Sequence, residues 1–492
     1  MQAQLRAPSG AGSWQQARSA RRARADCRAS AGLSSRAPAP LPAFSPASDA
    51  SPSPRCSSPA SSSAPLPSVR APAPSLRRGP APPASSAPTA PVAPAAPAPA
   101  PALTPGGSTE SRAVGMLLGA MCGNVLGAPH QDERQYQVVS VRRTGVTDFW
   151  KYDFGPDAVP YGEYTGEMCN LLAVAASLVA CNGAHPDALR EAIVGSYSPE
   201  TRRYSPYDKI VAEAVLQGVD PADVPELAER YLAEATRRHA STASDRAERE
   251  PYGPSDLCAA ARAAPIGYAY RSAPHDQLLT AVRASLEFSH ATPLGLDAAA
   301  VVAAAVGWAA RQQAGEPGAE GAGEGGEGAE GGCGPEALLA FLTEHVAVTT
   351  DMRGKLALLK DGLFQVGPVT DWRSFYAGPA WARLAGLFSR LSFHGYATVG
   401  SEFAAVALLA FLSSWGRPEQ AVIIAASFGG HAPATAQVVG ALGGALYGDG
   451  WLPDRWLDEL ENGEEAGRDA VAKLARELAA VEVAKGLATR EE

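Results

Sequence analysis

The seven cysteines of this 492-residue chain include no pair at the Cys-x-x-Cys spacing of redox or zinc sites. They also form no regularly spaced disulfide framework. We therefore expect free thiols in a reducing compartment, with Cys122, Cys169 and Cys258 as small core residues on helical faces. The full set is Cys27, Cys56, Cys122, Cys169, Cys181, Cys258 and Cys333.

Long apolar runs are also missing. Outside the Ala/Pro-rich tracts, no uninterrupted apolar stretch reaches the roughly 18 residues that a membrane helix needs, so we expect no membrane span. Positive charge is scarce after residue 107, where 31 basic residues face 49 acidic ones and the formal charge is −18. Such a domain repels phosphate backbones, so we expect no nucleic-acid partner.

Residues 1–107 contain eleven arginines, no lysine and two acidic residues among Ala, Pro and Ser. This segment cannot bury enough apolar surface to offset its conformational entropy, so we expect it to be disordered. An Arg-rich, Ser-rich and acid-poor composition is typical of organelle transit peptides. The early cluster from Arg18 to Arg28 would suit a mitochondrial address, whereas the long Ser/Pro-rich continuation favours a plastid. An ordinary disordered tail is the third alternative. The Pro/Ala run from Pro82 to Pro105 is expected to be a semi-rigid linker.

Residues 108–492 are predicted to form one all-α domain, because apolar residues recur there at three- and four-residue spacing and no series of alternating strands appears. Gly440 and Gly444 should let two helix backbones approach closely. Residues 314–335 repeat Gly and Glu and are expected to form a flexible surface insertion. The stretch from Gly463 to Ala488 is expected to be an amphipathic closing helix. Other helices are expected over Thr165–Ala180, Asp256–Arg271, Leu294–Arg311, Val399–Leu412 and Ala434–Leu446.

Four segments combine glycine with polar residues in a distinctive order. They read GMLLGAMCGNVLGAP from Gly115, GEYTGEM from Gly162, RAAPIG from Arg262 with a later Ser289-His290, and GGHAPATA from Gly429. Together they resemble the ADP-ribosylglycohydrolase family over about residues 112–448. The family patterns are close to G-x-L-L-G-x-x-x-G-D-x-L-G-A-P-x-E, T-D-D-T, R-A-x-P-[LI]-G and G-G-D-x-D-T-x-A.

This resemblance implies a compact helical fold and a site with two Mg²⁺ ions. In the family, carboxylates and hydroxyls of the first, second and fourth segments hold the ions. The ions clamp the ribose of an ADP-ribosyl group while its glycosidic bond is hydrolysed. Mg²⁺ requires oxygen ligands, preferably anionic, and paired ions need several negative charges to offset their repulsion.

The sequence departs from the family pattern at most of the implied metal positions. Asn124 and Gln131 replace the acidic residues of the first segment. In the second segment Thr165 is kept, while Gly166 and Glu167 replace two aspartates. In the fourth, His431, Pro433 and Ala434 replace two aspartates and a threonine, and Thr435 follows one residue later. We therefore predict that the two-metal site is lost and that no cofactor is bound.

The surviving polar residues have both structural and functional interpretations. Thr165 and Glu167 could simply cap a helix start, and His431 with Pro433 could begin another helix. His290 could contact a ligand or be a satisfied buried histidine. Glu167 and His431 are the candidate catalytic residues. The candidate ligand cleft comprises Thr165, Glu167, His290, Gly429, Gly430, His431 and Thr435.

Three functions remain open at this point. The first is a protein without the parental hydrolysis that binds an ADP-ribose-like, nucleotide-like or other small ligand, or a protein partner. The second is an active hydrolase of ADP-ribosyl or related glycosidic bonds with an altered metal site or none. The third is a structural or assembly protein whose cleft is filled by side chains. An open polar pocket would favour binding or chemistry, and a filled one would favour structure.

Overall fold

The computed structural model describes residues 101–141, 145–150, 159–239, 253–312, 333–392, 395–463, 466–481 and 483. The predicted tail up to residue 100 and residues 314–332 of the Gly/Glu insertion lie outside them. The described part is helical, and its only β-type pairings are the isolated bridges Arg134–Gly429 and Asp256–Val399. The all-α prediction is confirmed.

Helices follow one another along the whole described chain. They are α2 (Thr109–Gly127), η1 (Ala128–His130), α3 (Gln135–Val141), α4 (Gly166–Cys181), α5 (Pro186–Gly195), α6 (Pro206–Leu216), α7 (Val224–His239), η2 (Gly253–Ser255), α9 (Cys258–Ala261), α10 (Ala264–Ala269), α11 (His275–Ala284), α12 (Pro293–Arg311), α13 (Pro335–Phe341), η3 (Leu342–Val346), α14 (Thr350–Gly362), α15 (Trp372–Tyr376), α16 (Pro379–Leu391), α17 (Gly400–Ser413), α18 (Pro418–Ser427), α19 (Ala432–Tyr447), α20 (Asp454–Leu457) and α21 (Arg468–Ala479).

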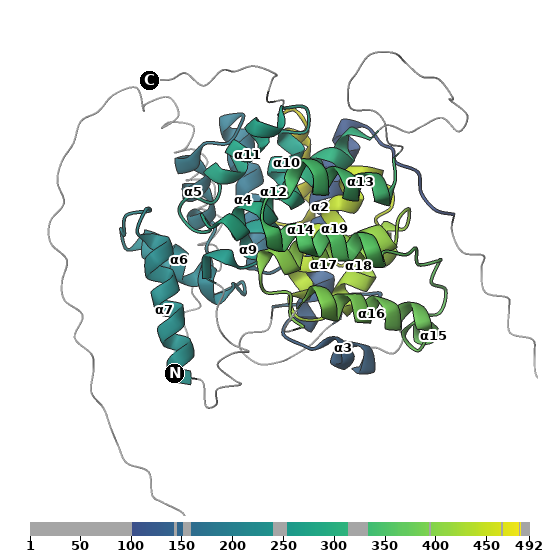
Figure 1. Ribbon diagram of the computed structural model, residues 1–492. Coiled ribbons are helices and arrows are strands. Elements are labelled where there is room, and N and C mark those ends of the chain that lie inside the picture. The colour runs from purple at the N-terminus through teal and green to yellow at the C-terminus, as the bar shows by residue number, and fades with distance from the viewer. Residues whose placement is uncertain are drawn as a thin grey trace, which may run out of the picture. The chain divides into compact units, whose positions relative to one another are not determined.

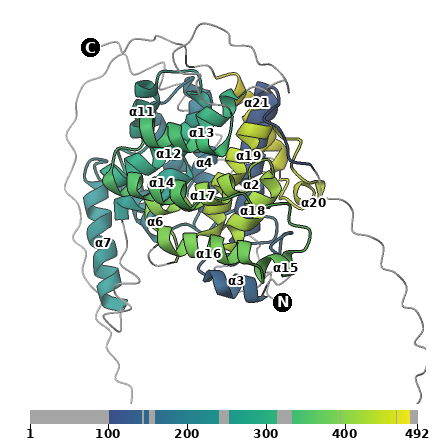
Figure 2. The same ribbon diagram turned by 45° about the vertical axis from the view of Figure 1, so that its right-hand side comes forward.

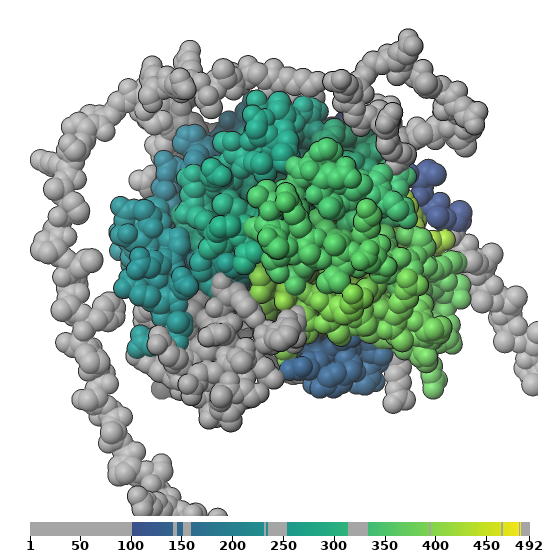
Figure 3. All heavy atoms as spheres, viewed as in Figure 1, coloured from purple at the N-terminus to yellow at the C-terminus, as the bar shows by residue number. Residues whose placement is uncertain are grey.

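The first and fourth sequence segments lie on the two central helices, α2 and α19. These helices run side by side through the interior (Figures 1 and 2), with α12, α17 and α18 packed against α19. Residues 333–392, shown in green, cover much of the face seen in Figure 3. Side chains that α2 and α19 direct toward each other are therefore placed in the core.

Glycine allows α2 and α19 to touch along their backbones. A Cβ atom added at Gly440 would lie 2.0 Å from the carbonyl oxygen of Gly119, and one at Gly444 would lie 1.9 Å from the carbonyl carbon of Gly115. No side chain fits at such distances. The close approach predicted for Gly440 and Gly444 is confirmed.

Two helical stretches, Thr109–His130 and Pro293–Arg311, are long and apolar enough to cross a membrane by length and composition. Their apolar windows are 100% and 78% buried inside the fold. Both are core helices of this domain, which explains their composition without a bilayer.

The helix predicted over Asp256–Arg271 is broken into α9 and α10, and that prediction was wrong. Pro265 has no N–H to donate to the carbonyl of Ala261, and the chain turns between the two short helices. The side-chain amide of Gln437 donates to that carbonyl instead, at 2.8 Å. The break therefore ties the third segment to α19.

The closing helix predicted over Gly463 to Ala488 is observed as α21 over Arg468–Ala479. Residues 464–465, 482 and 484–488 of the predicted range lie outside the described residues. Val471 and Leu478 are buried on its inner face, and Val481 is buried just beyond its end. Arg271 donates to the carbonyls of Ala479 and Val481 at 3.3 and 3.4 Å. These bonds satisfy carbonyls at the helix C-terminus and place a cation there.

Residues 103–107, which the sequence analysis assigned to the tail, contact the folded body. The backbone N–H of Leu103 donates to Gly416, and that of Gly106 donates to Leu446. Arg112 Nε lies 3.2 Å from the carbonyl oxygens of both Gly106 and Gly107. The ordered body therefore begins before the proposed boundary at residue 107.

Candidate functional site

The first, second and fourth segments meet in a buried amide network centred on Asn124 of α2. Its side-chain N–H groups donate to the Thr165 hydroxyl and to Gln437 Oε1, both at 2.9 Å. Its oxygen accepts from the Thr165 backbone N–H at 2.8 Å. Asn124, Thr165 and Gln437 are all buried. Both the donors and the acceptor of the Asn124 amide are therefore bonded to neighbouring protein groups.

Gln437 is a member of this network that sequence analysis missed. It lies on α19, close after Ala434, and its amide links Asn124 to the Ala261 carbonyl. The available signal was a single long polar side chain within an otherwise apolar and small-residue helix. Buried amides generally require such partners.

Glu167 is the one carboxylate at the family's metal positions. It is the second residue of α4, in the first turn of the helix, and is 2% exposed. Its Oε2 accepts a hydrogen bond from the Thr165 hydroxyl at 2.5 Å. Burial raises the pKa of Glu167 to about 7, against the lowering effect of the Thr165 hydroxyl.

Thr165 is the N-cap residue of α4, as its position predicted, but its hydroxyl caps no helix N–H. The backbone N–H of Gly166 instead donates to the carbonyl of Arg203 at 2.7 Å. The Thr165 hydroxyl faces Asn124 and Glu167. The capping interpretation of this side chain was therefore wrong.

The space beside Gly166 is filled by the ring of Tyr204. A Cβ atom at Gly166 would lie 2.3 Å from Tyr204 Cδ1. The phenol is held in place because its hydroxyl donates to the Ser196 carbonyl at 2.9 Å and accepts from the Ser198 N–H at 3.2 Å. An aspartate at position 166 would have no room for its side chain.

The fourth segment enters α19 through a glycine turn. Gly429 and Gly430 have φ values of +70° and +59°, a region that favours glycine. The N–H of Gly430 donates to Glu133 at 2.7 Å, which fastens the turn to the segment after η1. The predicted helix start at His431 and Pro433 is confirmed, with Pro433 in the first turn.

His431 is half-buried at this helix start, and its side chain makes no cap bond. Its Nε2 lies 3.4 Å from the hydroxyl of Thr398, and burial lowers its pKa. Thr435 is buried and its hydroxyl donates to the His431 carbonyl at 3.0 Å. Arg203 forms an ion pair with Asp132, and its positive charge acts to lower the pKa of both His431 and Glu167.

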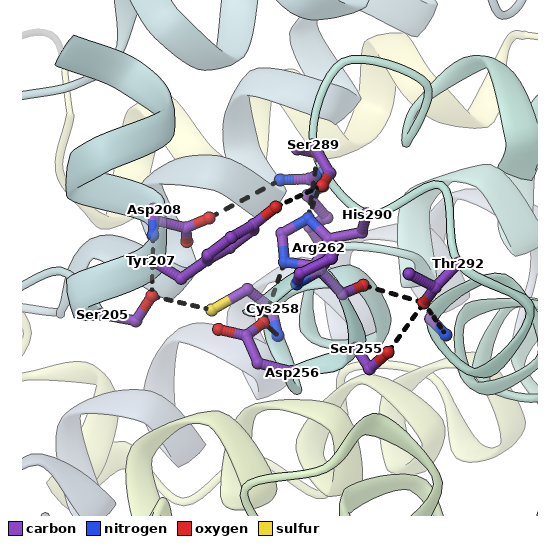
Figure 4. A network of polar contacts seen from close by, with 12 residues as sticks. Ser205, Tyr207, Asp208, Ser255, Asp256, Cys258, Arg262, Ser289, His290 and Thr292 are labelled. Atoms are coloured by element: carbon purple, nitrogen blue, oxygen red, sulfur yellow. Dashed lines mark hydrogen bonds and ion pairs between the residues drawn. The ribbon is translucent and has the colours of Figure 1, made fainter. Parts of the chain in front are cut away.

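His290 lies in a separate buried network of the third segment, shown in Figure 4. Its Nε2 is 2.8 Å from Asp256 Oδ1, and its Nδ1 is 2.9 Å from Ser289 Oγ. Arg262 Nη2 donates to the same hydroxyl at 2.6 Å and to the Ser285 carbonyl at 3.1 Å. The Tyr207 ring and the imidazole form a T-shaped pair with centroids 5.0 Å apart.

Ser289, His290 and Asp256 have the hydroxyl–imidazole–carboxylate order of a hydrolytic triad. Ser289 and His290 are 0% exposed and Asp256 is 6% exposed. Arg262 also occupies the hydroxyl that would have to attack a substrate. Both ring nitrogens of buried His290 have protein partners, which favours the structural interpretation of this residue.

The residues at the family's metal positions do not fit a two-Mg²⁺ cluster. Asn124 directs amide donors at Thr165 and Gln437, Tyr204 fills the space beside Gly166, and Pro433 and Ala434 carry no side-chain oxygen. Throughout the described ranges, no group of three or more His, Cys, Asp or Glu side chains could hold a metal ion. Among these family positions only residue 167 carries a carboxylate, whereas paired ions need several.

A family model described as ADP-ribosylglycohydrolase matches residues 105–487 of the chain. The chain belongs to the ADP-ribosylglycohydrolase family. No curated protein matches it. One solved structure to which it is similar is titled "ADP-ribosylglycohydrolase-related protein complex", with 21% identity, 75% of this chain and 98% of that chain covered, and a TM-score of 0.46.

Proposed function

We propose that this ADP-ribosylglycohydrolase-family protein does not hydrolyse ADP-ribosyl bonds and acts as an interaction or assembly protein. The observation that carries the proposal is the packing of the family's metal positions into the core. Asn124 is fully bonded to protein groups, and Tyr204 takes the volume that an aspartate at position 166 would need. Ligand sites are concave pockets with exposed polar groups, whereas these two positions are occupied by packed protein groups.

Mg²⁺ binding tests this proposal without a substrate. The full chain should melt at the same temperature with and without millimolar Mg²⁺, because the ligand set lacks the required carboxylates. An ion present at 100 times its dissociation constant would add about 2.7 kcal/mol of stability. A catalytically active member of the family serves as the positive control, and a clear rise in Tm of this chain with Mg²⁺ would count against the proposal.

One observation favours a second candidate, a hydrolase that works without the two ions. The carboxyl of Glu167 has its pKa raised to about 7, which suits a general acid or base at neutral pH. His431, half-buried at the start of α19, is the other candidate catalytic residue, and the charge of Arg203 acts on both groups. Against this candidate stand the 2% exposure of Glu167 and its hydrogen bond to Thr165.

The two candidates differ in what Glu167→Gln does. Under the second candidate, any release of ADP-ribose by the full chain is abolished by this substitution and does not depend on Mg²⁺. Under the first, neither protein releases ADP-ribose. Turnover that survives in Glu167→Gln would exclude Glu167 as the acid or base.

The two partner classes left open by sequence are a small ligand, ADP-ribose-like or other, and a protein. The packing around Asn124 and Tyr204 makes us favour a protein partner. Isothermal titration of the full chain with free ADP-ribose should then give no binding heat. Saturable heat with one site per chain would favour the ligand-binding alternative.

A further inference from the structure

Tyr204, which fills the space beside Gly166, belongs to a loop at the protein surface. Residues 196–205 connect α5 to α6 (Figures 1 and 2). The tip of this loop, from Pro199 to Thr201, is exposed, whereas Tyr204 is 4% exposed. The phenol hydroxyl bonds within the same loop, to one backbone carbonyl and one backbone N–H. The position of the ring therefore depends on how the loop is attached to the body.

Arg202 makes the first attachment. Its Nη1 is 2.9 Å from Glu163 Oε2, and its Nη2 is 2.8 Å from Glu461 Oε2. The guanidinium also lies over the ring of Tyr164, 4.1 Å from the ring centroid. The Arg202 side chain is 11% exposed, so salt screens these ion pairs less than it screens pairs at the surface. Arg202 thus ties the loop to the segment before α4 and to the segment between α20 and α21.

Arg203 makes the second attachment. Its side chain pairs with Asp132, and its backbone carbonyl accepts from the Gly166 N–H at 2.7 Å. Asp132 has a φ of +66°, which is uncommon for a residue other than glycine. Its N–H donates to the Gly430 carbonyl at 2.8 Å. Arg203 thus ties the loop to the second and fourth sequence segments.

The two attachments depend on each other's charge. Without their carboxylate partners, Arg202 and Arg203 would be neighbouring positive charges that are partly buried, which favours their release into water. Surface loops can open locally while the core stays folded. We propose that residues 197–204 form a plug, which these arginines clamp shut and which opens locally to free the space beside Gly166. Opening would not restore metal ligands, so this device rests on the proposed function and adds a movable part to its packed site.

Cys169 reports on the plug. It lies one turn after Gly166 on α4, is 6% exposed, and its thiol contacts the Tyr204 phenol. Burial raises the pKa of Cys169 to about 11. Because the thiolate is the reactive form, iodoacetamide should alkylate this thiol slowly while the plug is closed and faster whenever it opens.

Alkylation rates of the full chain, followed for each cysteine by mass spectrometry, test the proposal. In Arg202→Gln, Cys169 should be alkylated at least ~tenfold faster than in the wild type, because two partly buried carboxylates lose their partner. In Arg203→Gln the increase should be ~2- to 5-fold, because the lost ion pair is more exposed. Cys122, which is 0% exposed on α2, monitors global unfolding and should keep its wild-type rate. Alkylation of Cys169 at the wild-type rate, or only in step with Cys122, would overturn the proposal.

Arg455→Gln is the matched control. Arg455 also pairs with two carboxylates, Asp148 and Glu419, and lies over an aromatic ring, that of Trp456. This substitution should leave the Cys169 rate unchanged, and an increase equal to that of Arg202→Gln would also overturn the proposal. The proposed function fails instead on stabilisation by Mg²⁺ or release of ADP-ribose, so the two failures are distinguishable.

Discussion

A side chain at position 166 would have to share its space with the ring of Tyr204. Gly166→Asp should therefore destabilise the protein by at least ~1–3 kcal/mol through overpacking, and more because its carboxylate would be buried. Gly354→Asp is the matched control, because a Cβ at this exposed helical glycine meets nothing within 4 Å. Urea denaturation of both variants provides the comparison.

The same clash predicts coupling between the two positions. In a Tyr204→Ala background, Gly166→Asp should cost less by ~1–3 kcal/mol, because the removed ring frees the space. Tyr204→Ala alone should cost about 3–5 kcal/mol as a large core truncation. Strictly additive costs in this double-mutant cycle would show that Tyr204 does not occupy the position-166 side-chain space.

Glu167 should make the stability of the protein depend on pH. Its pKa is raised from an ordinary 4.5 to about 7 in the folded state. Below pH 4.5 both states keep the proton and there is no penalty. As pH rises through 7 the folded protein must accept a buried charge that the unfolded chain already carries. The free energy of unfolding should therefore fall by ~3 kcal/mol between the ordinary pKa of 4.5 and the raised pKa of about 7.

Glu167→Gln isolates this contribution, because glutamine is nearly isosteric and cannot titrate. Relative to Glu167→Gln, the wild-type free energy of unfolding should decline between about pH 4.5 and pH 7–8. Denaturation curves at a series of pH values provide the measurement. If the free energies of unfolding of the two proteins changed with pH in parallel, the pKa of Glu167 would not be raised in the folded protein.

At the level of single residues, the sequence predicted which residues lie in the candidate site better than it predicted what each side chain contacts there. Comparison with the family's motifs placed Asn124, Thr165 and Glu167 in one site, because the resemblance implies that the first and second segments meet there. It assigned Thr165 a capping role that its hydroxyl does not perform. Tyr204 and Gln437 were missed because neither belongs to a family pattern, and their contacts join residues distant in sequence.

Substitutions that add side-chain volume should be tolerated least at the contact between α2 and α19. Gly440→Ala places a methyl group 2.0 Å from the Gly119 carbonyl oxygen, so the helices must separate. We expect a loss of several kcal/mol or failure to fold. Gly386→Ala, at an exposed helical glycine with open space around it, should instead stabilise by ~0.5–1 kcal/mol. Thermal unfolding of both variants tests this, and similar Tm changes would contradict the close helix contact.

The start of the folded body can be tested by truncation. A chain lacking residues 1–100 should unfold like the full protein, whereas one lacking residues 1–107 should be helical but less stable. The second deletion removes the bonds of Leu103 and Gly106 and two acceptors of the buried Arg112. Circular dichroism melts compare the two. Equal Tm values would place the boundary at residue 107, as first proposed.

Helices were predictable where apolar spacing was uninterrupted, as in α4, α12, α17 and α19, whose observed ends lie close to the expected ones. The predicted single helix over Asp256–Arg271 failed at Pro265. There a tertiary bond from Gln437 replaces the helical bond that proline cannot make. Local periodicity contains no information about such a substitute partner.

For the whole molecule, the proposed function treats the family's metal positions as packed core. The glycines of α2 and α19 allow the close helix contact. Under the proposed function, the residues at positions 124 and 166 no longer supply ligands to a metal ion. Restoring single residues should not recover activity, because ligands of one site act as a unit. Pro433 and Ala434 would still supply no oxygen in a Gly166→Asp variant.

Release of ADP-ribose from an ADP-ribosylated substrate is the most direct test of this account. The full chain would be assayed with millimolar Mg²⁺ and with chelator, beside an active family member and the Glu167→Gln variant. We expect no release above the enzyme-free blank under either condition. Substantial Mg²⁺-dependent turnover by the unmodified chain would contradict it.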